Sequence, residues 1–473
     1  MRAFRLAGVA LVPLFACFGS STGSPADGGV DAQSADTFVP VEAGGGDAPT
    51  TGPSCTMPAT GTGTMQGSVS KPETWTQAGS PYVLLFDIEI TAPLTLEPCT
   101  TVLIPAQKTV SVTTGGSIVA KGTAAGPVFI AKKDTANWAS IRALTGGTLS
   151  FDHTNIDGGG DPLNGSLDFT GALDIRADST TPLAEILHAN TLSITSSMGQ
   201  GIYLHAGGAF SADSAAVSIS GSKGYPIHAS ANLAGTIPAD SGSLYTQNAI
   251  NEILLSGANA GETIITWDVK LRDVGVPYHI GASSEQGRLD VGGSPAGKAT
   301  LTIDPNVTLR FKKGGVLYVD FFSGSNPATG AMVAVGTQQK PIVFTSAEGN
   351  PAAGDWLGLN FGDVPSSTSK LDFVTIAFAG GSSGSGSGSC PYPGTTINDA
   401  AIRIHGPPPS AFITNGSITD SLTNGIDRGW AANNLTDFLT DGTNKFARVP
   451  GCTQTYPKDS NNGGCPTPVP CPK

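Results

Sequence analysis

The phrase Leu94-Thr95-Leu96-Glu97-Pro98 returns 207 positions later as Leu301-Thr302-Ile303-Asp304-Pro305. Both copies are followed by the same landmarks in the same order. After the first copy these are Thr101-Val102-Leu103-Ile104, Gly115-Gly116, Gly122-Thr123, Pro127-Val128-Phe129-Ile130, Trp138 and Leu149-Ser150-Phe151. After the second copy they are Val307-Thr308-Leu309-Arg310-Phe311, Gly314-Gly315, Gly336-Thr337, Pro341-Ile342-Val343-Phe344, Trp356 and Leu371-Asp372-Phe373. The sequence therefore predicts two long internal repeats, at about 93–160 and 300–381.

A shorter repeat lies between the two long ones. Ile194 and Ile219, Gly199 and Gly224, and Ile202 and Ile227 are each 25 residues apart. A further copy places Ile418 eight positions before Ile426, as Ile194 precedes Ile202. A period in the twenties fits one coil of a parallel β-helix, in which each coil supplies short strands that stack on those of the coil below.

Composition favours an all-β fold. The chain has 473 residues, of which 63 are Gly and only 13% are charged. Gly and β-branched residues disfavour helices, because they lose more conformational entropy there than Ala or Leu. The net charge of −12 argues against nucleic acid as a partner, since phosphate binding needs clustered Lys and Arg.

The stretch Gly354-Asp355-Trp356-Leu357-Gly358-Leu359 carries a resemblance to a known family. With the repeated phrases above, it resembles the right-handed parallel β-helix proteins of the pectate-lyase-like superfold on bacterial surfaces. The resemblance covers most of residues 80–430, and departs at Asn137-Trp138-Ala139-Ser140-Ile141 and at Cys99, where Gly is usual. It implies a right-handed β-helix but no single activity, because this fold carries unrelated functions. The Asn-Thr-Asp, Asp-Asp and Gly-His-Gly motifs of enzymes on this fold do not occur in the chain.

The N-terminus is typical of an exported protein. Arg2 and Arg5 precede an apolar run, Leu6 to Ala16, that is too short to cross a bilayer. Leu14-Phe15-Ala16-Cys17 resembles the bacterial lipobox, which implies residues 1–17 as a lipoprotein signal peptide and Cys17 as the lipidation site. We expect a lipid anchor at the outer membrane or cell surface. The alternative is an ordinary cleaved signal and a secreted or periplasmic protein.

The remaining chain divides into three parts. Residues 18–54 are rich in Gly, Ala, Ser and Asp, lack Lys and Arg, and are predicted to be a disordered linker. Residues 55–450 are predicted to form the β-helix, and residues 451–473 a Cys- and Pro-rich tail.

Six cysteines remain once Cys17 is assigned to the lipid. An even number in an exported chain indicates disulfides, here Cys55, Cys99, Cys390, Cys452, Cys465 and Cys471. We expect Cys55 to pair with Cys99 and the other four to pair among themselves. Because these cysteines lie near the start and the end of the predicted β-helix, we expect the disulfides to cross-link its two ends.

One acidic region is a candidate ligand site. The chain is dense in acids from Asp152 through Asp157, Asp161 and Asp174, with Asp168 and Asp178 nearby. Asp152 and Asp174 are 22 positions apart, which could place them on neighbouring coils, where their oxygens could bind calcium. Arg142 and Arg176 could then serve a lyase-type role. The competing interpretation is a set of exposed acids at turns, and no other cofactor is expected.

Two histidines and three tryptophans are further candidates. His205 and His228 could meet on adjacent coils, as a metal-binding pair or a structural one. Trp138 and Trp356 share a repeat position, which predicts packing, whereas Trp430 is expected to be more exposed.

Two functional hypotheses follow. The first is a non-catalytic surface lipoprotein, a rigid scaffold for adhesion, glycan contact or envelope structure, with a polysaccharide or another surface protein as partner. The second is a divergent polysaccharide lyase or glycoside hydrolase of the same superfold.

Overall fold

The computed structural model describes residues 54–55, 58–162, 170–177, 183–256, 263–282, 287–292, 298–320, 329–362, 364–384, 388–392 and 399–471. These residues belong to one compact unit, Thr51–Lys473; the other unit is Met1–Thr50. The predicted signal peptide, Cys17 and almost all of the predicted linker lie outside the described residues.

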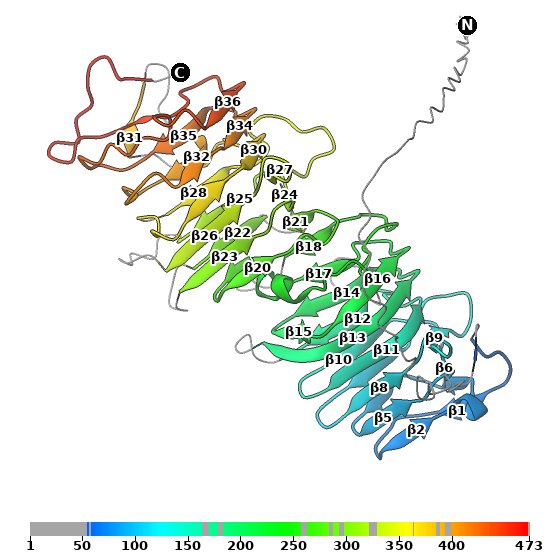
Figure 1. Cartoon of the computed structure of the whole chain (residues 1–473). Helices are drawn as coiled ribbons and strands as arrows, with labels where there is room; N and C mark the ends of the chain where they lie inside the picture. Colours follow the sequence, from blue (N-terminus) through cyan, green and yellow to red (C-terminus); the bar gives the residue numbers. More distant parts are fainter. Residues whose placement is uncertain are drawn as a thin grey trace, which may run out of the picture. The chain divides into compact units, whose positions relative to one another are not determined.

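Four sheets contain nearly all of the regular structure (Figure 1). Sheet A comprises β1 (Thr64–Gln66), β2 (Glu73–Trp75), β3 (Tyr82–Leu84), β5 (Pro93–Leu96), β6 (Thr101–Ile104), β8 (Ser117–Lys121), β9 (Val128–Lys132), β11 (Thr148–Asp157), β13 (Ala184–Thr195), β15 (Gly208–Phe210) and β16 (Ala215–Ser220). Sheet B comprises β4 (Ile88–Ile90), β7 (Thr109–Val112), β10 (Ser140–Ala143), β12 (Gly171–Arg176), β14 (Gln200–His205), β17 (Ile227–Ala229), β18 (Ile253–Leu255), β21 (Tyr278–Ile280), β24 (Thr308–Phe311), β27 (Ile342–Ser346), β30 (Val374–Ala377), β34 (Ser417–Thr419) and β36 (Lys445–Ala447).

The other two large sheets lie in the C-terminal half of the chain. Sheet C comprises β19 (Ile264–Ile265), β22 (Arg288–Val291), β25 (Val316–Val319), β28 (Gly358–Phe361), β32 (Ala400–Ile404) and β35 (Asn424–Arg428). Sheet D comprises β20 (Val269–Leu271), β23 (Ala299–Ile303), β26 (Gly330–Val335), β29 (Lys370–Asp372) and β33 (Ile413–Thr414). The remaining elements are the antiparallel pair β31 (Ser389–Cys390) and β37 (Tyr456–Pro457), and two short 3-10 helices, η1 (Gln77–Gly79) and η2 (Ala231–Thr236).

The chain visits the sheets in rotation. β23, β24 and β25 belong to sheets D, B and C, and β26, β27 and β28 repeat that order one coil later. Each strand pairs in parallel with its counterpart in the next coil. The structure is thus all-β with long parallel sheets, which is consistent with the predicted parallel β-helix.

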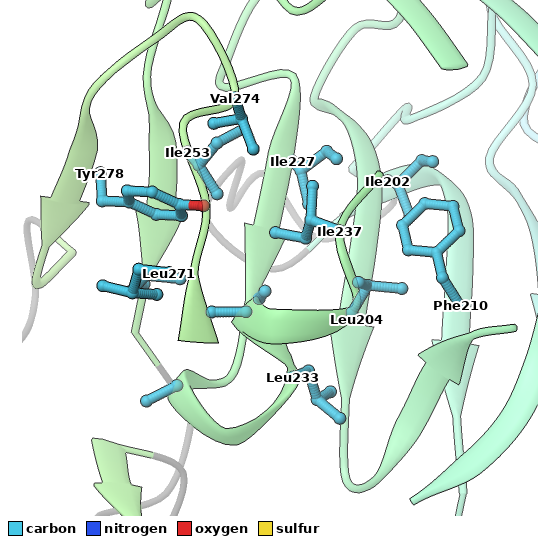
Figure 2. Packing of buried hydrophobic residues seen from close by; sticks show 14 of the residues in the cluster. Ile202, Leu204, Phe210, Ile227, Leu233, Ile237, Ile253, Leu271, Val274 and Tyr278 are labelled. Atoms are coloured by element: carbon cyan, nitrogen blue, oxygen red, sulfur yellow. The ribbon is translucent and has the colours of Figure 1, made fainter. Parts of the chain in front are cut away.

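The core consists of columns of apolar side chains that stack from coil to coil. Ile202 pairs in register with Ile227, Ile227 with Ile253, and Ile253 with Tyr278, and none of the four is more than 1% exposed. Figure 2 shows these side chains in one row, with Leu204, Phe210 and Leu271 close by. The predicted 25-residue repeat is confirmed here, because Ile194 also pairs with Ile219.

The long repeat is also visible strand by strand. β5, β6 and β7 correspond to β23, β24 and β25. Trp138 directly precedes β10, and Trp356 directly precedes the corresponding strand, β28. One landmark was matched wrongly: Gly115-Gly116 follow β7, whereas Gly314-Gly315 precede β25. A pair of glycines is too common at coil corners to fix an alignment by itself.

The two long repeats occupy different sheets. β10 belongs to sheet B but its counterpart β28 belongs to sheet C, although sheet B runs unbroken through β17, β18 and β21. Between β17 and β18 the chain forms η2 in place of a strand. The same displacement affects the short repeat, because Ile194 and Ile202 lie in sheets A and B, whereas Ile418 and Ile426 lie in sheets B and C.

The tryptophans are packing residues. Trp138 and Trp356 are fully buried, and their indole N–H groups donate to the carbonyl oxygens of Asp157 (3.2 Å) and Ala377 (2.8 Å). The expectation for Trp430 was wrong, because this side chain is only 1% exposed. Its indole N–H donates to the carbonyl oxygen of Asn434 (2.8 Å) within the last coils.

Three disulfides lie near the two ends of the described unit. They are Cys55–Cys99, the pairing that we expected, together with Cys390–Cys465 and Cys452–Cys471. Cys99 has a left-handed backbone (φ 64°), as does Asn306 (φ 75°) at the same repeat position, a conformation that Gly adopts at the least cost.

Pairing continues past the predicted boundary at residue 450. The Ile426 N–H donates to the Thr453 carbonyl (2.9 Å), and the Thr455 N–H donates to the Ile426 carbonyl (2.9 Å). The first part of the Cys- and Pro-rich tail therefore pairs with β35 as part of a further coil.

Candidate functional site

A ladder of polar and aromatic side chains follows the outer face of sheet B. Side chains alternate across a strand, so the residues between the core positions of β10, β12, β14 and β17 point outward. In register, these are Arg142, Asp174, Tyr203 and His228. The row therefore places one polar side chain on each of four consecutive coils.

Asp174 is the centre of this ladder. Its carboxylate lies 3.5 Å from Arg142 Nε and 2.5 Å from His205 Nε2. The His205 ring stacks on Tyr203 with 4.2 Å between ring centroids, and His228 stacks on the same ring at 4.4 Å. Tyr203 and His228 are 3% and 0% exposed, so this part of the outer face is covered.

The ladder continues onto the next coils with a second charged group. Glu252, which is 7% exposed, accepts a hydrogen bond from His279 Nδ1 (2.7 Å) and pairs with Arg310. Burial alone would raise the pKa of Glu252. The hydrogen bond and the charges of His279 and Arg310 outweigh it, and the pKa lies below its usual value.

A second ladder follows the outer face of sheet C. Asp290, Tyr318, Asn360, Arg403 and Asp427 are register neighbours on β22, β25, β28, β32 and β35. Four of them are buried, at 6% exposure or less, and Tyr318 is half-buried. β28 follows Trp356 as β10 follows Trp138, so the two ladders meet the long repeat at the same position.

The second ladder is held by a charge pair at one end and by hydrogen bonds from neutral hydroxyl groups at the other. The Arg288 side chain donates from Nε to both carboxylate oxygens of Asp290 (2.8 and 2.9 Å), and its guanidinium lies 4.8 Å from the Tyr318 ring centre. At the other end Asp427 accepts hydrogen bonds from Ser389 (2.6 Å) and Thr455 (2.9 Å).

The middle of the second ladder consists of two buried polar side chains, Asn360 and Arg403. Arg403 Nη1 donates to Ser383 Oγ (2.6 Å) and lies 3.6 Å from Asp399. Among the described residues, the buried Asn360 Oδ1 has no hydrogen-bond partner. A buried amide oxygen without a partner costs free energy, and such atoms often mark places for a water molecule or a ligand group.

The structure divides the predicted acidic cluster. Asp152 and Asp157 lie on β11 in sheet A, whereas Asp174 lies on β12 in sheet B. Asp152 approaches His188 (3.6 Å), and Asp157 approaches Lys132 (3.2 Å).

We expected Asp152 and Asp174 to stack on neighbouring coils, and this expectation was wrong. The register partner of Asp152 on the next coil is Asn190, 38 positions later, so a separation of 22 positions does not reach the same place on the next coil. Asp161 follows β11, and Asp168 and Asp178 lie outside the described residues.

The two candidate arginines have different surroundings. Arg142 contacts Asp174, as described above, whereas Arg176 is exposed at the end of β12, opposite His205. Within the described part of the chain, no three His, Cys, Asp or Glu side chains are grouped so that they could hold a metal ion. His205 and His228 do come together, through their shared contact with Tyr203.

A further histidine, His188, brings serine and aspartate together, but not as a catalytic triad. His188 Nδ1 lies 3.2 Å from Ser211 Oγ and 3.1 Å from Asp213, and Ser211 also donates to Asp213 (2.7 Å). A triad needs the nucleophile and the orienting acid on opposite ring nitrogens. Here Ser211 and Asp213 both lie at Nδ1, and the Ser211 hydroxyl donates to Asp213 and not to the imidazole. The acid on the opposite side, Asp152, lies 3.6 Å from Nε2, which is beyond hydrogen-bond distance. The geometry therefore does not support nucleophilic catalysis.

Sequence reasoning missed the ladder on sheet C completely. Its members are separated by 28, 42, 43 and 24 positions, which no periodic search would connect. The available signal was the shared repeat position after Trp138 and Trp356, which relates Arg142 on β10 to Asn360 on β28.

Comparison of the chain with protein-family models, with curated proteins and with solved structures found no match. Among the described residues, no helix is long and apolar enough to span a membrane. Three disulfides are typical of proteins from an oxidising compartment.

Proposed function

We propose that this protein is a non-catalytic, exported lipoprotein, whose right-handed parallel β-helix is a rigid scaffold at the outer membrane or cell surface. A right-handed path is the expected one, because crossovers between parallel strands of one sheet are almost always right-handed. Its contacts would be with a polysaccharide or another surface protein.

The pairing of charges along the ladder on sheet B carries this proposal. Asp174 on β12 is shared by Arg142 and His205 on the coils to either side, and Glu252 beside β18 is shared by His279 on the next coil and Arg310 on the coil after that. Such contacts hold adjacent coils in register. They support a structural use of these side chains along the outer faces.

The anchoring part of the proposal can be tested in cells. The full chain should incorporate labelled palmitate, and Cys17→Ala should abolish that label and release the protein into a soluble fraction. A Cys55→Ala variant is the matched control, because it also removes one cysteine and should keep the label. Unchanged labelling of Cys17→Ala would refute a lipid anchor at this residue.

A divergent polysaccharide lyase remains the second candidate, favoured by the contact of Asp174 with Arg142 and His205. An acid, a base and a cation in contact are the groups that proton abstraction from a uronic acid requires. The test is the absorbance of unsaturated products from uronic-acid polysaccharides, with and without calcium. Product formation that disappears in Asp174→Asn would replace the scaffold proposal by the enzymatic one.

A further inference from the structure

The outer face of sheet A is apolar over its first coils. Met65 on β1 pairs in register with Val83 on β3. Val83 pairs in turn with Leu103 on β6, and Leu103 with Ala131 on β9. This row points outward, because the side chains before and after Val83 and Leu103 belong to the buried core. The outward rows described above on sheets B and C are, in contrast, polar or aromatic.

Two further apolar side chains extend this row at the corner after β3. Leu85 and Phe86 are 54% and 50% exposed, and Met65 is 54% exposed. The Phe86 ring reaches the first coil, because a Cβ added at Gly67 would lie 3.5 Å from its Cζ atom. We call Met65, Leu85, Phe86 and Leu103 the N-terminal patch. Three of the eight large hydrophobic side chains that are exposed in the described part of the chain fall within it. Such a cluster marks a contact with a protein or a membrane.

The surroundings of the N-terminal patch are not acidic. Residues 58–134 contain five lysines and five acidic residues, whereas the whole chain carries a net charge of −12. Lys132 and Lys133 directly follow Ala131 at the end of the outward row, and Lys133 is exposed. Basic side chains beside an apolar patch favour a surface of anionic lipids. The charge of this end therefore suits a phospholipid surface better than that of the chain as a whole.

The chain that follows the predicted lipidation site joins the described unit beside this patch. Cys55 is bonded to Cys99 through a disulfide, and the Ala59 N–H donates to Thr101 Oγ1 (2.8 Å) at the start of β6. β6 is also the strand that carries Leu103. Figure 1 shows β1, β6 and β9 together at the N-terminal end of this unit.

The connection to the predicted lipid is short. Only the 37 residues 18–54 separate Cys17 from Cys55. A lipid on Cys17 would therefore keep the N-terminal patch close to the membrane surface, and closer than the last coils. This placement argues for the membrane as the occupant of the patch.

We propose that the N-terminal patch docks onto the phospholipid surface that holds the lipid anchor. This proposal rests on the proposed function, because the lipid on Cys17 is the tether. Met65, Leu85 and Phe86 would enter the boundary between headgroups and acyl chains, and Lys133 would meet anionic headgroups. So few half-exposed side chains bind weakly by themselves, but a tether keeps them at a high local concentration. Release of Cys17→Ala into the soluble fraction therefore remains the expected result.

Oxidation of methionine tests this docking in the full chain. Lipidated protein in vesicles of phosphatidylethanolamine and phosphatidylglycerol is treated with chloramine-T, a charged oxidant, and sulfoxide at each methionine is followed by mass spectrometry. The reference is Cys17→Ala mixed with the same vesicles. Met65 should be oxidised about threefold or more slowly in the lipidated protein, as expected when about two thirds of the molecules are docked.

Met198 is the internal control. It is 46% exposed and follows β13, the fifth strand along sheet A from β1. Its oxidation rate should be the same in the lipidated protein and in Cys17→Ala. Equal protection of Met65 and Met198 would overturn the proposal, because it would show a general effect of the vesicles.

Leu85→Ser and Leu435→Ser are matched variants. Both leucines are 54% exposed, so neither substitution should unfold the chain, but Leu435 lies between β35 and β36 in the last coils. In the lipidated protein, Leu85→Ser should return Met65 toward the oxidation rate of Cys17→Ala, whereas Leu435→Ser should not. The proposal is overturned if the two variants behave alike.

Two further outcomes would also overturn it. Protection of Met65 in Cys17→Ala that increases with protein concentration, without vesicles, would assign the patch to a second copy of the chain. Sedimentation of the lipidated protein with the vesicles, without protection of Met65, would leave the anchor intact and remove the docking alone. A full chain that carries no lipid and stays in the supernatant would refute the anchor, and the docking proposal would be refuted with it.

Discussion

Replacing Trp356 by Ala should be one of the most destabilising single changes in the chain. The side chain is fully buried, stacks on Phe311 with 4.3 Å between ring centroids, and donates to the Ala377 carbonyl. Removing a buried tryptophan costs about 3–5 kcal/mol, and an aromatic pair adds about 0.5–1.5 kcal/mol. We expect a loss near 5 kcal/mol in the free energy of unfolding.

Two further variants separate the contributions. Trp356→Phe keeps a ring against Phe311 but leaves the Ala377 carbonyl unpaired, which should cost about 1–3 kcal/mol. Trp138→Ala should cost about 3–4 kcal/mol, less than Trp356→Ala, because Ile104 stands where the second repeat has Phe311.

The assay is urea unfolding of the full chain followed by circular dichroism, extrapolated linearly to water. The reasoning is refuted if Trp356→Ala loses less than about 1 kcal/mol, or if Trp138→Ala is the more damaging change.

Two other outcomes are expected. Gly358→Ala should lose about 3 kcal/mol or more in the same urea assay, because the Gly358 φ is +110° and an added Cβ would lie 2.3 Å from the Ala401 carbonyl oxygen; near-native stability would contradict this. Glu252→Gln should cost about 1–2 kcal/mol at neutral pH. Since the pairing with His279 and Arg310 lowers the folded-state pKa of Glu252, its contribution is present above the unfolded value near 4.5 and is lost as pH falls through the folded pKa. Urea titrations between pH 3 and pH 7 should show the variant and parent converging in acid; a constant difference would count against the charge pairing.

Repetition made the fold predictable. The returning phrases at Leu94 and Leu301 and the 25-residue spacing of Ile202 and Ile227 reflect stacked coils, since the same side chain must fill the same core position in each coil. The sequence could not show that the second repeat lies on other sheets than the first, because sheet membership depends on how the coils stack and not on any one residue.

The candidate site was less accessible to sequence reasoning. Arg142 and Asp174 were recognised and do meet, but Asp152 was placed on the wrong sheet. Loops of variable length change the spacing between coils, so the register of a polar residue cannot be counted from its neighbours. The same variation hid the ladder of Asn360 and Arg403, whose residues are neighbours only after folding.

The stacking of parallel coils is the claim on which everything else depends, and cysteine cross-linking tests it directly. Thr302 and Val333 face outward and are register partners on β23 and β26. Their Cα atoms should lie about 4.8 Å apart, within disulfide range. The double variant Thr302→Cys, Val333→Cys should therefore form an additional disulfide efficiently, whereas Thr302→Cys, Val335→Cys, shifted by two residues, should form it poorly. Absence of the first cross-link, or equal formation of both, would contradict the parallel stacked arrangement.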